Sequence, residues 1–118
     1  MPNTASGGAG ERFAAEYLRK KGYRIPAVNI RCRLGEIDIV AENGRYIAFV
    51  EVKTRGAGSF THPFEAITPG KRARIVKTAQ FYLLGHPTGL QPRFDAAAVF
   101  MPGDAPARIE YLENVFFG

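Results

Sequence analysis

Three charged side chains interrupt two apolar, β-rich runs that flank the turn signal Asn43-Gly44. Asp38 lies in the first run, whereas Glu51 and Lys53 lie in the second. Two carboxylates held close together repel each other unless a positive charge lies between them, and oxygen ligands from Asp and Glu suit Mg²⁺. The spacing therefore favours a metal-binding cleft over a sheet. The alternative is a network of ion pairs on a half-exposed sheet.

The Asn-Gly signal predicts a β-hairpin centred on residues 43 and 44. Directly opposed residues and alternate residues share a face of such a hairpin. The predicted pairs are Glu42 with Arg45, Val40 with Ile47, Asp38 with Phe49, and Glu36 with Glu51. One face then carries Glu36, Asp38, Val40, Ile47, Phe49, Glu51 and Lys53, and the other carries the apolar residues Ile37, Ile39, Ala48, Val50 and Val52. On the charged face Asp38 and Glu51 are diagonal neighbours, with β-carbons expected within roughly 7–8 Å.

The rest of the chain supplies the elements that must position this hairpin. After a flexible segment over residues 1–9, an amphipathic helix is predicted over 10–21, closed by Gly22. An irregular strand follows over 23–31, and Pro26 favours an edge position for it. Residues 56–66 read as a loop, and Thr68 with Pro69 predicts the start of a second helix that ends at about residue 84. Two more strands, over 93–100 and 107–116, complete a single α/β domain over residues 10–118.

Composition limits the class of protein. The 118-residue chain has a formal net charge of +5, and its basic residues gather at 19–24, 31–33 and 71–77. Such clusters suggest a polyanionic partner, and a solvated helix face is the alternative for each of them. No apolar run approaches the roughly 20 residues that cross a bilayer, and the N-terminus lacks the order of a secretory signal. With one cysteine, Cys32, no internal disulfide forms, so a cytoplasmic location without a membrane partner is expected.

Several motifs, in order along the chain, resemble a known family. GERFAAEYLRKKGYRI, NIRCRLGEIDIVA, IAFVEVKTR, ITPGKRARIVKTAQFYL and RFDAAAV are similar to the YraN-type family of small endonucleases. An Asp followed on the next strand by Glu-x-Lys is the core of the PD-(D/E)-x-K nuclease motif, and the family is similar to archaeal Holliday-junction resolvases. The likeness covers residues 10–115, and it departs from the motif at the nominal Pro, where Ile37 stands.

The resemblance implies a restriction-endonuclease-like fold, with a central mixed five-stranded sheet flanked by helices. It also implies a metal-dependent endonuclease that acts on DNA, including branched DNA in repair or recombination. By matching position, Asp38 and Glu51 would bind Mg²⁺ or Mn²⁺ together with the Val52 carbonyl. Lys53 would be the catalytic lysine, as a base or as an electrostatic stabiliser, and Glu11 would be an accessory acid. Resolvase-like relatives act as dimers, so a homodimer is a further expectation.

Other polar residues are candidates for supporting roles. Glu36 faces the same way as the central acids, and could instead pair with Arg33 or Arg55. Gln80 lies on the second helix, either as an accessory residue or as an ordinary surface residue. Asp95, inside a strand beside an arginine, is interpreted as half of a structural ion pair. Phosphate contacts, which raise affinity without reading sequence, are expected from Arg31, Arg33, Arg55, Lys71, Arg72 and Arg74.

Functions from three classes fit these observations. The leading hypothesis is a nuclease, because the two acids and the lysine of the motif are all intact. The alternative is a nucleic-acid-binding module on the same fold with weak or no turnover. The third is a protein-interaction domain whose charged hairpin is a solvated face.

Overall fold

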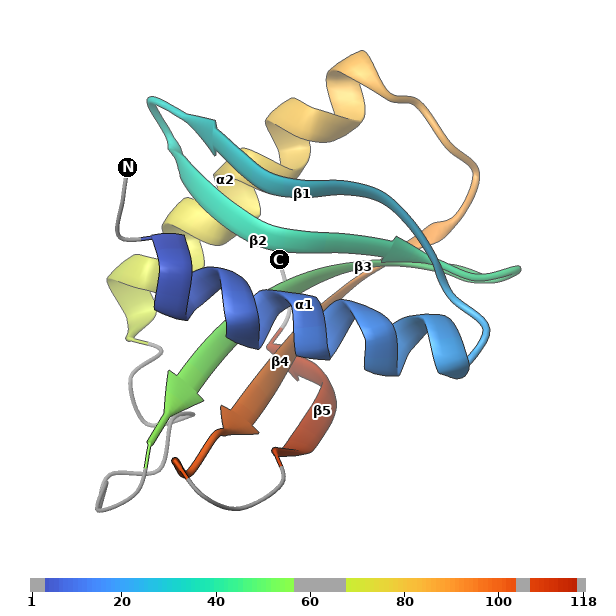
Figure 1. Ribbon diagram of the computed structural model, residues 1–118. Coiled ribbons are helices and arrows are strands. Elements are labelled where there is room, and N and C mark those ends of the chain that lie inside the picture. Colours follow the sequence, from blue (N-terminus) through green and yellow to red (C-terminus); the bar gives the residue numbers. More distant parts are fainter. Residues whose placement is uncertain (1–3, 57–67, 104–106, 117–118) are drawn as a thin grey trace.

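Two helices and five strands make up the part of the chain that the computed structural model describes, residues 4–56, 68–103 and 107–116 (Figure 1). In chain order they are α1 (Thr4–Lys20), β1 (Arg24–Cys32), β2 (Gly35–Glu42), β3 (Tyr46–Arg55), α2 (Pro69–Gly85), β4 (Gln91–Phe100) and β5 (Arg108–Phe116). This order confirms the predicted α/β fold class. α1 begins ahead of the predicted start at Gly10, and residues 57–66 of the predicted loop lie outside the described residues.

The strands form a mixed sheet in the order β1-β2-β3-β4-β5. β1 and β2, β2 and β3, and β4 and β5 pair antiparallel, whereas β3 and β4 run parallel. Parallel neighbours need a crossover connection, and α2 lies in it. β1 is an edge strand, as Pro26 predicted, and its register with β2 shifts between Arg24 and Ala27.

The two helices cover opposite faces of the sheet (Figure 1). α1 buries Ala14 and Leu18 in a cluster with small and branched residues of β2, β3 and β4. α2 buries Ile75, Ala79 and Tyr82 in a second cluster on the other face. Neither of these two described helices is long and apolar enough to cross a bilayer. The sheet is therefore the middle of three layers, with a core on each side.

The helix ends that were predicted from local signals are formed. The Thr68 side chain caps α2 by accepting a hydrogen bond from Lys71 N at 3.2 Å. α1 ends in a Schellman motif, in which Gly22 has a φ of 97° and Tyr23 N donates to Leu18 O at 3.0 Å. These caps fix where each helix starts or stops relative to the sheet.

The hairpin of β2 and β3 is formed, but its register differs from the predicted one by two residues. Glu42 pairs with Ile47 rather than with Arg45. The loop is longer than the Asn-Gly signal suggests because the Asn43 side chain accepts hydrogen bonds from the Arg45 and Tyr46 amides. A shift of two residues leaves each side chain on the same face of a strand, whereas a shift of one would have reversed the faces.

The pairing of β2 with β3 ends at Ile39 and Val50, just before Asp38. Beyond this point β2 pairs only with β1 among the described strands, so it is free to twist away from β3. Ile37 packs in the cluster under α2, whereas Ile39 packs in the cluster under α1. The prediction that both would share one face was therefore wrong for Ile37, because strict alternation breaks at Asp38.

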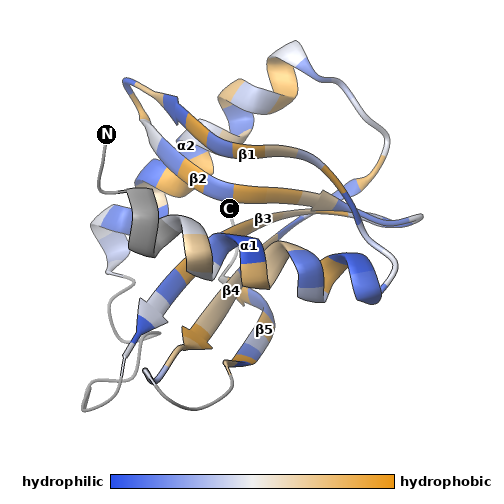
Figure 2. Cartoon of the chain, viewed as in Figure 1, coloured by the Kyte–Doolittle hydropathy of each residue, from blue (hydrophilic) through white to orange (hydrophobic). Residues whose placement is uncertain are grey.

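The C-terminal half of β3 differs in character from its neighbour. Figure 2 shows β3 becoming hydrophilic toward its end, while β4 beside it stays largely hydrophobic. Glu51, Lys53 and Arg55 give β3 this character, and Ala97 and Val99 of β4 are buried. Charged side chains are thus concentrated at the end of the sheet where β2 and β3 separate.

A buried ion pair on β4 holds β5 in place. Asp95 is 1% exposed and accepts hydrogen bonds from the Arg93 guanidinium at 3.0 Å, the Tyr111 hydroxyl at 2.5 Å and the Asn114 amide at 2.9 Å. The Arg93 guanidinium also lies over the Tyr46 ring, 4.7 Å from its centroid. The predicted structural ion pair is confirmed, and it fixes β5 where its register with β4 shifts.

Replacing Asp95 by Asn should strongly destabilise the fold, because it removes the buried counter-charge of the Arg93 guanidinium. We expect the free energy of unfolding, measured with urea, to fall by about 3 kcal/mol. Glu113 also pairs with Arg93, at 3.8 Å, but its side chain is 62% exposed. Glu113→Gln should therefore change stability by less than about 0.5 kcal/mol. Equal losses in the two variants would contradict this account of the network.

Candidate functional site

The hydrophilic end of β3 borders an open cavity between the β1–β2 hairpin and α2, called the first cavity below. Asp38, Glu51 and Lys53 all line it. Its full lining is Arg31, Cys32, Gly35, Glu36, Asp38, Glu51, Val52, Lys53, Lys71, Arg74 and Ile75. The three residues of the motif therefore come together, on the side of the sheet that α2 covers, and charges of both signs surround them.

Asp38 provides a side-chain link at the point where β2 leaves β3. Its Oδ2 atom accepts a hydrogen bond from Val52 N at 2.7 Å. Burial, and then the negative charge of Glu51, raise the pKa of Asp38 to about 7, against the lowering effect of the Val52 hydrogen bond. At neutral pH the Asp38 carboxyl is therefore poised between its charged and neutral forms, and a nearby cation would favour the charged form.

Glu51 is held by two lysines. Its side chain is 10% exposed, and its Oε2 atom lies 3.2 Å from Lys53 Nζ and 3.2 Å from Lys71 Nζ. Burial lowers the pKa of Lys53, and the nearby Lys71 lowers it further, although Glu51 opposes the change. Burial also acts to lower the pKa of Lys71, but its hydrogen bond with Lys53 and the charge of Glu51 outweigh burial and raise it. Lys53 is thus the lysine of the pair that releases its proton more readily.

The contact between Lys71 and Glu51 was missed in the sequence, where Lys71 was predicted only as a phosphate contact. A signal was present, because Thr68 and Pro69 place Lys71 in the first turn of α2. That signal gives the position of Lys71 along the helix. It does not give the position of α2 relative to β3, which depends on packing of the whole sheet.

Glu11 reaches the same end of β3 from the α1 side. It is half-buried, and burial raises its pKa, with a further rise from the charge of Glu51 and a lowering by its hydrogen bond with Asn29. Glu11 lines a second cavity together with Val52 and Lys53, which also line the first. The two cavities therefore meet at β3.

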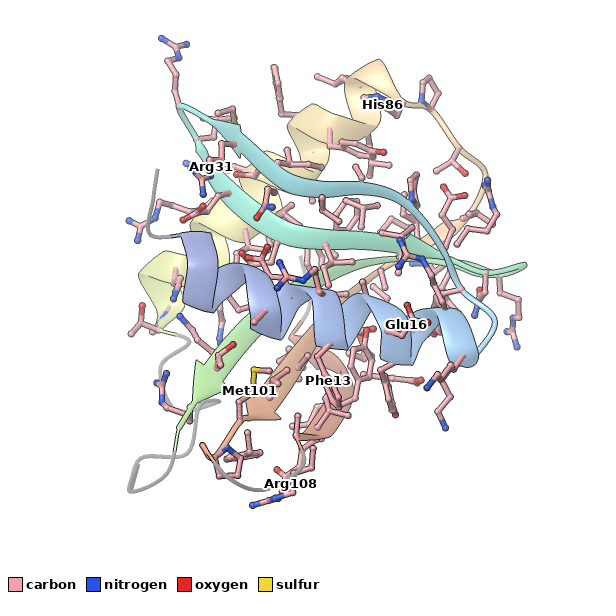
Figure 3. The ribbon with its side chains drawn as sticks, in the orientation of Figure 1. Phe13, Glu16, Arg31, His86, Met101 and Arg108 are labelled. Carbon is pink, nitrogen blue, oxygen red and sulfur yellow. The ribbon has the colours of Figure 1, made fainter. Side chains whose placement is uncertain are left out.

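Gly10 allows α1 to approach β3 this closely. A β-carbon on Gly10 would lie 1.9 Å from Thr54 Oγ1, far inside van der Waals contact. In Figure 3, Arg31 of the first cavity lies above the N-terminal half of α1, and Met101 of the second cavity lies below it. The start of α1 thus lines the second cavity through Ala9 and Glu11, and the charge of Arg31 from the first cavity acts on Glu11.

The other predicted site residues fall into three groups. Arg31, Glu36, Lys71 and Arg74 line the first cavity. Within this group Glu36 pairs with Arg31, Nε to Oε1 at 3.3 Å, whereas Arg33 or Arg55 was the alternative partner suggested by the sequence. Arg55 lines the second cavity. Arg33, Arg72 and Gln80 are exposed and are not part of the lining of the first cavity.

The predicted metal ligands, Asp38, Glu51 and the Val52 carbonyl, are chemically suited to a hard divalent cation. All three would offer oxygen, and the raised pKa of Asp38, caused first by burial and then by the charge of Glu51, shows that its ionised form is disfavoured without a bound cation. In the described ranges no group of three or more His, Cys, Asp or Glu side chains is placed to hold a metal ion. A cation at this position would therefore rest on two side chains, the main chain, and water or substrate, as Mg²⁺ often does.

Replacing Asp38 by Asn should stabilise the metal-free protein at neutral pH. The pKa of Asp38 is higher in the folded state than the usual 3.8, so its ionisation lowers the stability of the native protein as pH rises from about 4 to about 7. We expect Asp38→Asn to be more stable at pH 8 in EDTA by on the order of 2 kcal/mol, with the difference vanishing near pH 4. Urea unfolding across this pH range measures it.

Glu36→Gln is the matched control, because Glu36 is exposed at the edge of the same cavity. Its stability should follow that of the natural protein across the pH range, within about 0.5 kcal/mol. A destabilised Asp38→Asn protein at pH 8 would show that the Val52 hydrogen bond outweighs the burial of charge.

Comparison with known proteins places the chain in a family. The sequence model of the Uncharacterised protein family UPF0102 matches residues 10–99. A UPF0102 protein of Symbiobacterium thermophilum is 42% identical over 113 residues, which cover 93% of this chain and 94% of the relative. A UPF0102 protein of Caldanaerobacter subterraneus is 46% identical over 113 residues, which cover 93% of this chain and 93% of the relative. A UPF0102 protein of Persephonella marina is 48% identical over 94 residues, 79% of this chain and 81% of the relative. The YraN-type likeness is confirmed at this level, and the chain belongs to the UPF0102 family.

Proposed function

We propose that the protein is a divalent-metal-dependent nuclease of the PD-(D/E)-x-K type that hydrolyses phosphodiester bonds in DNA. The observation that carries the proposal is the convergence of Asp38, Glu51 and Lys53 on one cavity at the point where β2 and β3 part. The surrounding electrostatics support it, because the charge of Glu51 acts on Asp38 and Lys53 contacts Glu51 directly. A solvated face of a hairpin would not bury these groups together.

Asp38 and Glu51, with the Val52 carbonyl, would hold Mg²⁺ or Mn²⁺. When bound, such a cation supplies charge stabilisation at the phosphate that no side chain in the cavity provides alone. The chain's own contribution is to fix the two carboxylates. Val52 N holds the Asp38 carboxylate at 2.7 Å, and Lys53 holds Glu51 at 3.2 Å.

Lys53 is suited to act on the nucleophile or on the phosphate. Hydrolysis requires a water molecule to attack phosphorus while the 3′-oxygen leaves, and negative charge grows on the phosphate oxygens during this step. Burial lowers the pKa of Lys53, which makes its amine better suited than that of an exposed lysine to accept a proton from the attacking water. In its charged form the same group can donate a hydrogen bond to a phosphate oxygen. For either role the Lys53 amine has to lie next to the proposed metal ligands, and it lies 3.2 Å from Glu51 Oε2.

The basic side chains around the cavity support a nucleic-acid substrate. Arg31, Lys71 and Arg74 line the first cavity, and Arg55 lines the second. Contacts of this kind bind phosphates regardless of sequence. The likeness to Holliday-junction resolvases makes branched DNA the first structured substrate to test, and a homodimer the first assembly to look for.

Purified protein should cleave labelled single-stranded, duplex or four-way DNA in Mg²⁺ or Mn²⁺ and not in EDTA. Because each is assigned a part in the chemistry, Asp38→Ala and Lys53→Ala should each lower the rate by about 100-fold or more. Lys77→Ala, which removes an exposed lysine on α2 outside both cavities, should keep the natural rate. Gel electrophoresis of the products over time gives these rates.

Two results would redirect the proposal. Cleavage that persists in Asp38→Ala or Lys53→Ala would reject the assigned site. Salt-dependent binding of DNA without product in any divalent metal would instead favour the alternative function, a nucleic-acid-binding module on the same fold.

A further inference from the structure

The first cavity holds a second lysine that the Asp…Glu-x-Lys motif does not supply. Lys71 Nζ lies 3.2 Å from Glu51 Oε2, which is the same oxygen atom that Lys53 Nζ contacts at 3.2 Å. The Lys71 side chain is 31% exposed and that of Lys53 is 21% exposed. These ion pairs are therefore partly sheltered from water. Their charges are screened less than those of an ion pair on the exposed surface.

Lys71 occupies a helix position that disfavours a cation. It lies in the first turn of α2, where the helix dipole favours acidic side chains, and this turn contains no acidic residue. Its main chain is fixed there, because Lys71 N donates to Thr68 Oγ1. Contact with Glu51 offsets the unfavourable dipole. Lys71 is thus positioned by a cap on one side and by the carboxylate on the other.

The balance of charge around Glu51 suggests what Lys71 does. Two lysines contact one oxygen of the Glu51 carboxylate, and a phosphodiester oxygen is a second anionic acceptor to which a lysine released from Glu51 can donate. A divalent cation bound to Asp38 and Glu51 would repel the ammonium groups around Glu51, so we expect it to displace a lysine from this carboxylate. Lys71 is the one that leaves more easily, because it is the more exposed and comes from a separate element, whereas Lys53 is two residues away on the same strand.

We propose that Lys71 is a second active-site lysine that neutralises Glu51 in the metal-free protein and transfers to a phosphate oxygen when a divalent cation takes its place. The inference rests on the proposed function and extends it. A plain phosphate contact would strengthen DNA binding without affecting the metal. A lysine that competes for Glu51 must affect both, in opposite directions.

Calorimetry with Mn²⁺ in the absence of DNA tests the competition. Lys71→Met keeps the apolar stem and removes the charge, so we expect it to bind Mn²⁺ about fivefold more tightly than the natural protein. In EDTA the same variant should bind duplex DNA about fivefold more weakly, as followed by fluorescence anisotropy. Circular dichroism checks that the variant is folded.

Two matched variants isolate the effect of Lys71. Lys71→Arg retains the charge and should keep the natural Mn²⁺ affinity. Lys77→Met removes an exposed lysine six residues further along α2, and it should also leave Mn²⁺ affinity unchanged. If Lys77→Met tightened Mn²⁺ binding as much as Lys71→Met, general charge repulsion would explain the result and the inference would be overturned.

The outcomes separate this inference from the proposed function. If the natural protein binds Mn²⁺ and Lys71→Met binds it equally or more weakly, the role of Lys71 is overturned and the proposed metal site stands. If the natural protein binds no Mn²⁺ at all, both are overturned. Tighter Mn²⁺ binding together with weaker DNA binding in Lys71→Met supports the inference.

Discussion

The hydrogen bond from Val52 N to the Asp38 carboxylate is the contact on which the rest of the candidate site depends. Pairing of β2 with β1 continues to Cys32 and Gly35, and pairing of β3 with β4 continues to Arg55, whereas pairing of β2 with β3 stops short of Asp38. The sheet therefore splits at this end. The Asp38 carboxylate satisfies an amide that the split would leave unpaired, and the same position buries the carboxylate beside Glu51. The Asp38–Val52 hydrogen bond thus links β2 to β3 where the sheet splits, and it places the Asp38 carboxylate in the first cavity.

Two glycines set how closely the helices approach this split. Gly35 has a φ of 153°, and a β-carbon there would lie 2.9 Å from Thr78 Oγ1 of α2. On the other face, a β-carbon on Gly10 would lie 1.9 Å from Thr54 Oγ1. Larger residues at either position would push a helix away from the strand that it contacts. The absence of side chains at these positions is what allows the first turn of α2 and Glu11 of α1 to lie within electrostatic reach of the two strands.

The sequence predicted those features that depend on neighbours in the chain. Thr68 and Gly22 fix helix ends through hydrogen bonds to residues within a turn or two, so the pattern alone indicates them. The hairpin register was wrong by two residues, because the Asn43 side chain draws two more residues into the loop. The faces predicted for the side chains were kept because the register error was two residues, and side chains alternate between faces with a period of two. The contact between Lys71 and Glu51 could not be predicted, since it depends on where the crossover returns α2 to the sheet, and no local pattern encodes that distance.

Asp95 and Asp38 are both acids within the sheet, and their surroundings separate a structural role from a chemical one. Asp95 receives hydrogen bonds from a guanidinium, a hydroxyl and a main-chain amide, so its charge is fully compensated and contributes to holding β5. Asp38 receives the Val52 amide and faces the negative charge of Glu51. Lys53 and Lys71, which line the same cavity, both contact Glu51. A fold that can compensate one buried carboxylate so completely leaves the other short of positive charge, and perturbed groups of this kind in a cavity are typical of functional sites. Burial and the charge of Glu51 both disfavour the ionised form of Asp38, and a divalent cation bound beside it would supply the positive charge that favours this form.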